Sequence, residues 1–154
     1  MAHIHEKIDF TASICIVYKD KVLLHRHKKL DIWLPPGGHV ELDEDPNEAA
    51  IREAKEETGL DVELVGSQTS FDTPSSARDL IMPRFLNRHF FDETRTHEHV
   101  NMCFFARAKT HNAQPGEGEG AVRWFTKAEL ESGEFDIIPD VLAHARAALD
   151  ELAQ

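Results

Sequence analysis

The chain is poor in cysteine and has no long apolar run. The first shortage argues against a disulfide framework, and the second argues against a transmembrane helix. Of its 154 residues only Cys15 and Cys103 are cysteines, and each lies inside an apolar stretch. We therefore expect reduced thiols in a hydrophobic core, as in a cytoplasmic protein, and no disulfide framework. No apolar stretch approaches the roughly 20 residues of a transmembrane helix. The first residues lack the basic and apolar regions of a secretory leader.

Basic side chains are also scarce, with 17 Lys and Arg against 28 Asp and Glu, which gives a formal net charge of −11 when His is neutral. Nucleic-acid polymers and anionic membranes are bound through positive patches, so we expect neither as a partner. A small anionic substrate stays compatible with this charge if a metal ion bridges it to the protein. The length fits one domain over residues 1–154.

Strand and helix patterns are interspersed along the chain. Apolar and β-branched runs predict strands over 10–18, 22–27, 62–71, 84–91, 99–108 and 122–125, with 84–91 and 99–108 forming a hairpin. Helices are expected over 46–58, from a capping box at Thr126 and Glu129, and over 139–152. Strands mixed with a central and a terminal helix predict an α/β sandwich.

The most acidic segment, 34–60, begins with a Pro-Pro-Gly-Gly breaker and continues as a well-specified helix. Asp45 is placed to cap it, Pro46 occupies its first position, and Glu48 completes a capping box. Gly59 lies just past its end, where a left-handed residue is favoured. Asp45 and Glu48 are thus explained as capping residues.

Three further acids on this helix share one face. At about 100° per residue, Glu53, Glu56 and Glu57 fall within an arc of about 100°. Like charges at this spacing repel, and the C-terminal half of a helix disfavours anions. A hard divalent cation such as Mg²⁺ or Mn²⁺ removes that repulsion, because carboxylate oxygens are its preferred ligands.

The acidic face is also compatible with a plain solvated surface, and the segment before it partly fits a calcium loop. A glutamate-rich face is ordinarily just solvated, which needs no ligand. A calcium loop beginning at Asp43 fits at its first ligand positions. It then needs glycine at the sixth position and an acid at the twelfth, where this chain has Glu48 and Ala54. We therefore reject the calcium loop.

Residues 38–60 resemble the Nudix box, G-x5-E-x7-R-E-U-x-E-E-x-G-U, where U is a bulky aliphatic residue. The fixed letters fall on Gly38, Glu44, Arg52, Glu53, Glu56, Glu57 and Gly59, Leu60 fits the last U, and Ala54 departs by being small. The flanks "VLLHRH", "WLPPGG" and "RWFTKAEL" are also similar to the family. The resemblance implies a Nudix-type α/β/α sandwich with a mixed central sheet. It also implies hydrolysis of the pyrophosphate linkage of a nucleoside diphosphate linked to a group X, with Mg²⁺ or Mn²⁺ and water attack on phosphorus.

The resemblance also implies roles for single residues. Glu53, Glu56, Glu57 and the Gly38 carbonyl are the expected metal ligands. Arg52 is expected to orient the glutamates, or to form a helix ion pair with Glu48 or Glu56, and Glu44 to support them. The family places its general base variously, so Glu119 on a late loop, its neighbour Glu117, and Glu53 all stay candidates.

Substrate contacts are expected from Arg26 and His27 at a strand end, from Arg84 and Arg88 on one strand face, and from Asp140, which is also explained as a first-turn acid of the last helix. His97-x-His99 has the spacing of a metal-ligand pair. No cysteine or third histidine is evidently placed beside it, so the sequence favours surface or pocket residues.

The expected function is metal-dependent hydrolysis of a small nucleotide, with nucleoside triphosphates and their oxidised forms among the candidates. The alternatives are a nucleotide-sensing or interaction module without turnover, and an acidic structural domain without a ligand. The identity of X depends on loops whose geometry the sequence does not contain, and a homodimer is neither indicated nor excluded.

Overall fold

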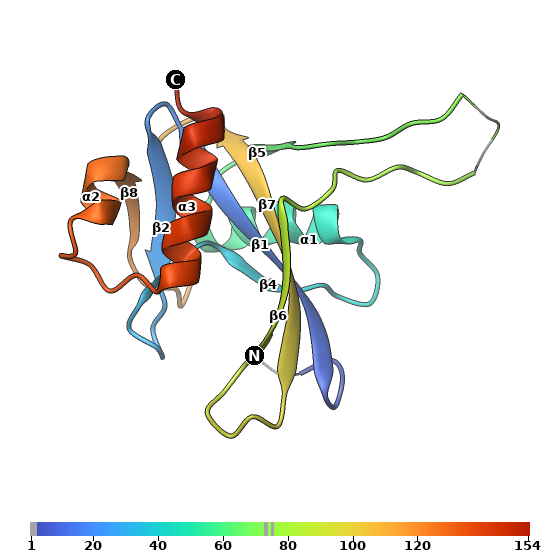
Figure 1. Cartoon of the computed structure of the whole chain (residues 1–154), viewed down its shortest axis with the longest axis horizontal. Coiled ribbons are helices and arrows are strands. Elements are labelled where there is room, and N and C mark those ends of the chain that lie inside the picture. The colour runs from blue at the N-terminus through green and yellow to red at the C-terminus, as the bar shows by residue number, and fades with distance from the viewer. Residues whose placement is uncertain (1–2, 73, 75) are drawn as a thin grey trace.

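The protein folds around one mixed β-sheet with helices on both faces (Figure 1). The structure is a computed structural model and describes residues 3–72, 74 and 76–154. Its elements are β1 (Ile8–Tyr18), β2 (Lys21–Arg26), β3 (Trp33–Leu34), β4 (Gly37–His39), α1 (Pro46–Thr58), β5 (Val62–Val65), β6 (Phe85–Phe90), β7 (Glu98–Ala108), β8 (Val122–Thr126), α2 (Lys127–Glu131) and α3 (Pro139–Leu152). This is the α/β sandwich that the sequence predicts. Among the described residues, no helix is long and apolar enough to cross a membrane.

Strand β1 organises the sheet, because it pairs with three other strands. It runs parallel to β7 from the Ile8–Glu98 pair to the Val17–Arg107 pair. Its second half pairs antiparallel with β2, and its first half pairs antiparallel with the short β4. The backbone of β4 is thereby fixed against the middle of β1, directly before the acidic segment.

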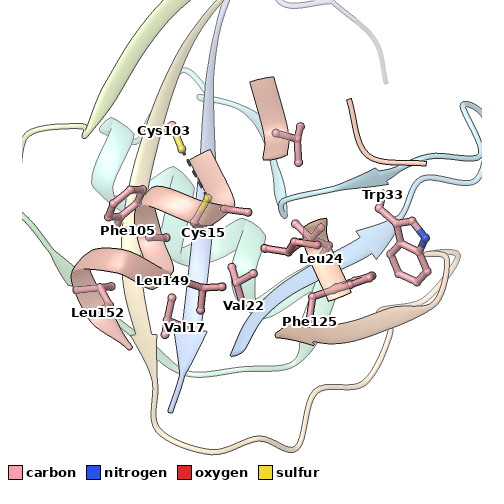
Figure 2. Packing of buried hydrophobic residues seen from close by; sticks show 14 residues of the cluster. Cys15, Val17, Val22, Leu24, Trp33, Cys103, Phe105, Phe125, Leu149 and Leu152 are labelled. Atoms are coloured by element: carbon pink, nitrogen blue, oxygen red, sulfur yellow. Dashed lines mark hydrogen bonds between the residues drawn. The ribbon is translucent and has the colours of Figure 1, made fainter. Parts of the chain in front are cut away.

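The two faces of the sheet bury different side chains. Cys15 and Val17 of β1 point toward α3, where they pack with aromatic and leucine side chains (Figure 2). The alternate residues Ile14 and Ile16 point toward α1, whose contact surface is made of alanines. Both cysteines are free and buried, as the sequence predicts. The alanines let α1 lie close to the sheet, which brings its glutamates near β4.

One sequence prediction about strands is wrong. The strand expected over 62–71 ends at Val65, because β6 pairs with β7 from Glu98 to Cys103 and leaves β5 no further partner there. The Pro-Pro-Gly-Gly segment separates β3 from β4, and its two glycines belong to β4. Gly37 pairs with Ser13 there, and a Cβ at Gly37 would lie 2.5 Å from the Ala12 carbonyl oxygen. Only a glycine backbone fits so close to β1.

The ends of α1 follow the capping prediction. The Asp45 side chain accepts the backbone N–H of Glu48 at 2.9 Å, and the Glu48 side chain accepts that of Asp45 at 2.9 Å. Gly59 has φ 73° and ends the helix in the left-handed conformation. These local bonds set where the helix begins and therefore which way its glutamates point.

We predict that Asp45→Ala lowers the free energy of unfolding by about 1 kcal/mol, because the first turn loses its side-chain cap. Urea denaturation of the two proteins measures this difference. Asp43→Ala is the matched control, since Asp43 is an exposed acid two residues earlier. An equal loss in both variants would show that charge, and not capping, matters here.

Candidate active site

Arg52 on α1 holds the acidic residues of the segment in place. Its guanidinium donates two hydrogen bonds to the Glu44 carboxylate, at 2.9 and 2.6 Å. It also donates to Glu53 at 2.9 Å, to Glu56 at 3.1 Å and to the backbone oxygen of His39 at 3.0 Å. Arg52 is thus placed for the orienting role that the resemblance implies. The residue that it binds through two hydrogen bonds is Glu44. These hydrogen bonds lower the pKa of Glu44 and keep it ionised.

The glycine strand β4 contacts two of the predicted metal ligands directly. Gly37 donates its N–H to Glu57 Oε2 at 2.9 Å. A Cβ at Gly38 would clash with Glu53 Oε1, so a side chain there would displace that carboxylate from the backbone. Glu53 and Glu57 are only 6% and 8% exposed, whereas Glu56 is exposed at the rim. The glutamate face of α1 is therefore mostly turned inward.

Burial makes Glu57 the most perturbed carboxyl group of the site. Desolvation raises its pKa to about 8, and the negative charges of Glu53, Glu119 and Glu56 act in the same direction. The hydrogen bond from Gly37 opposes this rise only in part. Near neutral pH this carboxyl group therefore holds a proton unless a cation takes its place.

The loop before β8 brings a further carboxylate to the site. Glu119, Glu57 and His25 each offer a ligand atom within 4.8 Å of the others. Gly116 donates its N–H to the Glu57 backbone oxygen at 3.1 Å and anchors this loop on the end of α1. Glu119 is therefore placed at the glutamates, whereas its neighbour Glu117 is exposed.

His25 is the site residue that sequence reasoning missed. It lies on β2 with its Nε2 3.7 Å from Glu57 Oε2, and it is only 3% exposed. Burial lowers its pKa to about 4, so the ring is neutral and has a free lone pair. The period of two along a strand was the available signal, because His25 follows the buried Leu23 by two positions and shares its face.

The residues predicted to contact substrate are engaged elsewhere. Arg26 pairs with Asp31 at 2.7 Å, and His27 Nδ1 accepts the N–H of Leu30. On β6 and before it, ion pairs join Arg88 to Glu98 at 2.6 Å and Arg84 to Glu151 at 3.0 Å. Asp140 lies in the first turn of α3 and acts electrostatically on His89. Hence, among the described residues, none of these five forms an ion pair with the site glutamates Glu53, Glu56 or Glu57.

The donor set fits a hard divalent cation. Carboxylate oxygens predominate among the possible ligands. Among the described residues, the guanidinium of Arg52 donates hydrogen bonds to Glu53 and Glu56 but not to Glu57 or Glu119. The buried negative charge is therefore incompletely neutralised by the chain. Carboxylate oxygens suit Mg²⁺ or Mn²⁺, and Glu53, Glu56, Glu57 and the Gly38 carbonyl are the residues that would hold it, with Glu119 beside them.

We predict that the metal-free protein loses stability as pH rises from about 6.5 to about 8. Above pH 6.5 the unfolded chain has lost its proton at Glu57, whose reference pKa is roughly 4.3, while the folded protein still holds it. The free energy of unfolding falls by at most about 2 kcal/mol, because the pH range between 6.5 and 8 is narrow. His25 acts in the opposite sense, but only below pH 6.5, because folding depresses its pKa, so the window is placed above that value. Denaturation at stepped pH in the presence of a chelator measures the loss.

In Glu57→Gln this pH dependence should disappear, while the exposed control Glu63→Gln should keep it. Added Mn²⁺ should also remove it in the unmodified protein, since a bound cation favours the ionised carboxylate. A pH dependence that persists in Glu57→Gln would contradict the assignment to this group.

Comparison with known proteins places this geometry in a family. A hydrolase of the NUDIX family from Clostridium perfringens superposes with a TM-score of 0.79 at 36% identity, covering 92% of this chain and 96% of that one. The dihydroneopterin triphosphate diphosphatase of Haemophilus influenzae is 34% identical over 110 residues, which are 62% of this chain and 69% of that protein. The m7GpppN-mRNA hydrolase NUDT17 of Xenopus laevis is 52% identical over 50 residues, 29% of this chain, and the match spans only 17% of that longer protein.

The family model described as NUDIX domain matches residues 9–145. This range includes the whole box, the glycine strand, His25 and the Glu119 loop. The chain belongs to the Nudix family.

Proposed function

We propose that the protein is a pyrophosphohydrolase that cleaves a phosphoanhydride bond of a small nucleotide by attack of water on phosphorus, with Mg²⁺ or Mn²⁺ as cofactor. The observation that carries this proposal is the group of buried carboxylates around Glu57, which lies against the Gly37–Gly38 backbone. So much negative charge is compatible with a diphosphate substrate only when a cation neutralises both. When bound, that metal would polarise phosphoryl oxygens and lower the pKa of a coordinated water.

The chain itself holds the carboxylates of the site in position. Arg52 fixes Glu53 and Glu56 relative to each other, and its bonds to Glu44 and the His39 carbonyl fix the guanidinium in turn. Gly37 orients the Glu57 carboxylate by its N–H bond. The ligands thus need little rearrangement when substrate binds, which is how positioning accelerates a reaction.

We assign the general base to Glu119. Glu53, the other candidate, has one carboxylate oxygen engaged by the guanidinium of Arg52, although burial raises its pKa. Glu119 is bonded through its backbone N–H to Gly116, and its half-buried side chain lies beside Glu57. A proton from the attacking water would pass to the Glu119 carboxylate.

The substrate to test first is a triphosphate. The Haemophilus influenzae relative is named a dihydroneopterin triphosphate diphosphatase, so the pterin triphosphate belongs in the panel beside ordinary and oxidised nucleoside triphosphates. Capped mRNA is a weaker candidate, because the NUDT17 match covers 29% of this chain and the net charge of −11 disfavours a polyanionic polymer.

We predict that Glu119→Gln lowers kcat by roughly 100-fold or more, the usual contribution of a general base. Product analysis on a panel of dihydroneopterin triphosphate, nucleoside triphosphates, nucleotide sugars and dinucleoside polyphosphates measures this and identifies the cleaved bond. Glu117→Gln is the matched control, two residues away on the same loop, and should stay within about twofold, since its exposed side chain supplies no catalytic group. Equal rates in the two variants would exclude Glu119 as the base.

Metal removal tests the proposal as a whole. A chelator should abolish turnover, and Mg²⁺ or Mn²⁺ should restore it in the unmodified protein but not in Glu57→Gln. The alternative function, a nucleotide-sensing module without turnover, predicts binding by calorimetry and no product on prolonged incubation with any member of the panel.

A further inference from the structure

A second group of possible metal ligands lies at the start of β1, outside the glutamate site. His3, Asp9, His97 and His99 each offer a ligand atom within 4.8 Å of the others. Sequence reasoning found no third ligand for the pair His97 and His99. The parallel pairing of β1 with β7 supplies it, because Asp9 is the direct partner of His99 in that register.

One oxygen, Asp9 Oδ2, lies at the centre of this histidine cluster. The ring nitrogens His97 Nε2, His3 Nδ1 and His39 Nε2 lie 3.1, 3.2 and 3.2 Å from it. Asp9 is fully buried. Around a tetrahedral Zn²⁺ with bonds of roughly 2.0–2.1 Å, neighbouring ligand atoms lie about 3.3 Å apart. The distances from Asp9 Oδ2 to these three ring nitrogens are therefore compatible with ligands that share one small cation.

The hydrogen bonds of His97 define which of its nitrogens faces the aspartate. Its Nδ1 lies 3.1 Å from the backbone oxygen of Glu6, an acceptor, so Nδ1 carries the proton. In the neutral ring Nε2 then presents a lone pair to the Asp9 carboxylate at 3.1 Å. Two acceptors at this distance repel unless a proton or a metal ion lies between them. A backbone carbonyl bound to the distal nitrogen is also the usual support of a metal-ligating histidine.

Protonation of His97 alone leaves the ring nitrogen Nε2 of His99 without a partner. Among the described residues this buried atom has no hydrogen bond, and the buried Nε2 of His39 has only the ion-pair contact with Asp9 at 3.2 Å. Both side chains are more than nine-tenths buried. An unpaired nitrogen in such a place is costly, and a bound cation removes the cost.

We propose that His3, Asp9, His97 and His99 form a second metal centre that binds Zn²⁺, with the His39 ring beside Asp9. Three imidazoles with one carboxylate suit Zn²⁺, whereas Mg²⁺ prefers oxygen. The centre differs in donor type from the glutamate site and does not depend on the proposed hydrolysis. It joins the segment before β1 to β7 and, through His39, to the end of β4.

The experiment is zinc titration of the chelator-treated full chain without an affinity tag, in excess Mg²⁺ to occupy the carboxylate site. We expect one tight equivalent of zinc by calorimetry and metal analysis. We also expect an increase in Tm of at least roughly 5 °C at zinc concentrations 100-fold above Kd. Co²⁺ in place of Zn²⁺ should give the visible absorption of a tetrahedral site.

Single histidine variants test where the zinc ion binds. His99→Asn should lose the tight equivalent, and His3→Asn, at an exposed position whose loss leaves the core intact, should weaken zinc binding by at least roughly tenfold. Their matched controls are His89→Asn, an exposed partner of His99 on β6, and His5→Asn, exposed two residues after His3. Both controls should bind like the unmodified protein. No tight zinc in the unmodified protein, or equal affinity in His3→Asn and His5→Asn, would overturn the proposal.

Discussion

The approach of the β4 glycine backbone to the glutamates of α1 is the contact on which the rest of the site depends. Gly38 lies so close to Glu53 that a side chain there would displace the carboxylate, and Gly37 donates its N–H to Glu57. The contact is possible because β4 pairs with β1 on one side, and because α1 presents alanines to the sheet on the other. Larger residues at either surface would move the helix and separate its carboxylates from the backbone.

Burial then gives the acids their chemistry. On a solvated helix face the glutamate carboxylates would repel one another only weakly and would need no ligand. Here Glu53 and Glu57 are buried, and only Glu53 has the guanidinium of Arg52 beside it. The raised pKa of Glu57 expresses this imbalance, and a divalent cation relieves it while leaving coordination positions for phosphate oxygens. The network thus favours metal binding at some cost to the stability of the metal-free fold.

The two clusters on the chain have different physical characters and a common neighbour. The glutamate site is rich in oxygen, and the histidine cluster around Asp9 is rich in imidazole nitrogen, so they favour different metal ions. His39 links them: its backbone oxygen accepts a hydrogen bond from Arg52, and its ring lies beside Asp9. The strand that holds the glutamates therefore also borders the proposed zinc centre.

The sequence by itself determined the limits of α1, the spacing of its glutamates and the family box, because caps and helical periodicity act between residues a few positions apart. It predicted most strands by their apolar pattern, but it missed the end of β5 at Val65, where competition from β6 decides the length. Only the tertiary structure brought His25 and Glu119 to Glu57, and His97 to Asp9 across 88 positions. These long-range contacts follow from strand pairing and loop anchoring. Both depend on the whole sheet and leave no local pattern in the sequence.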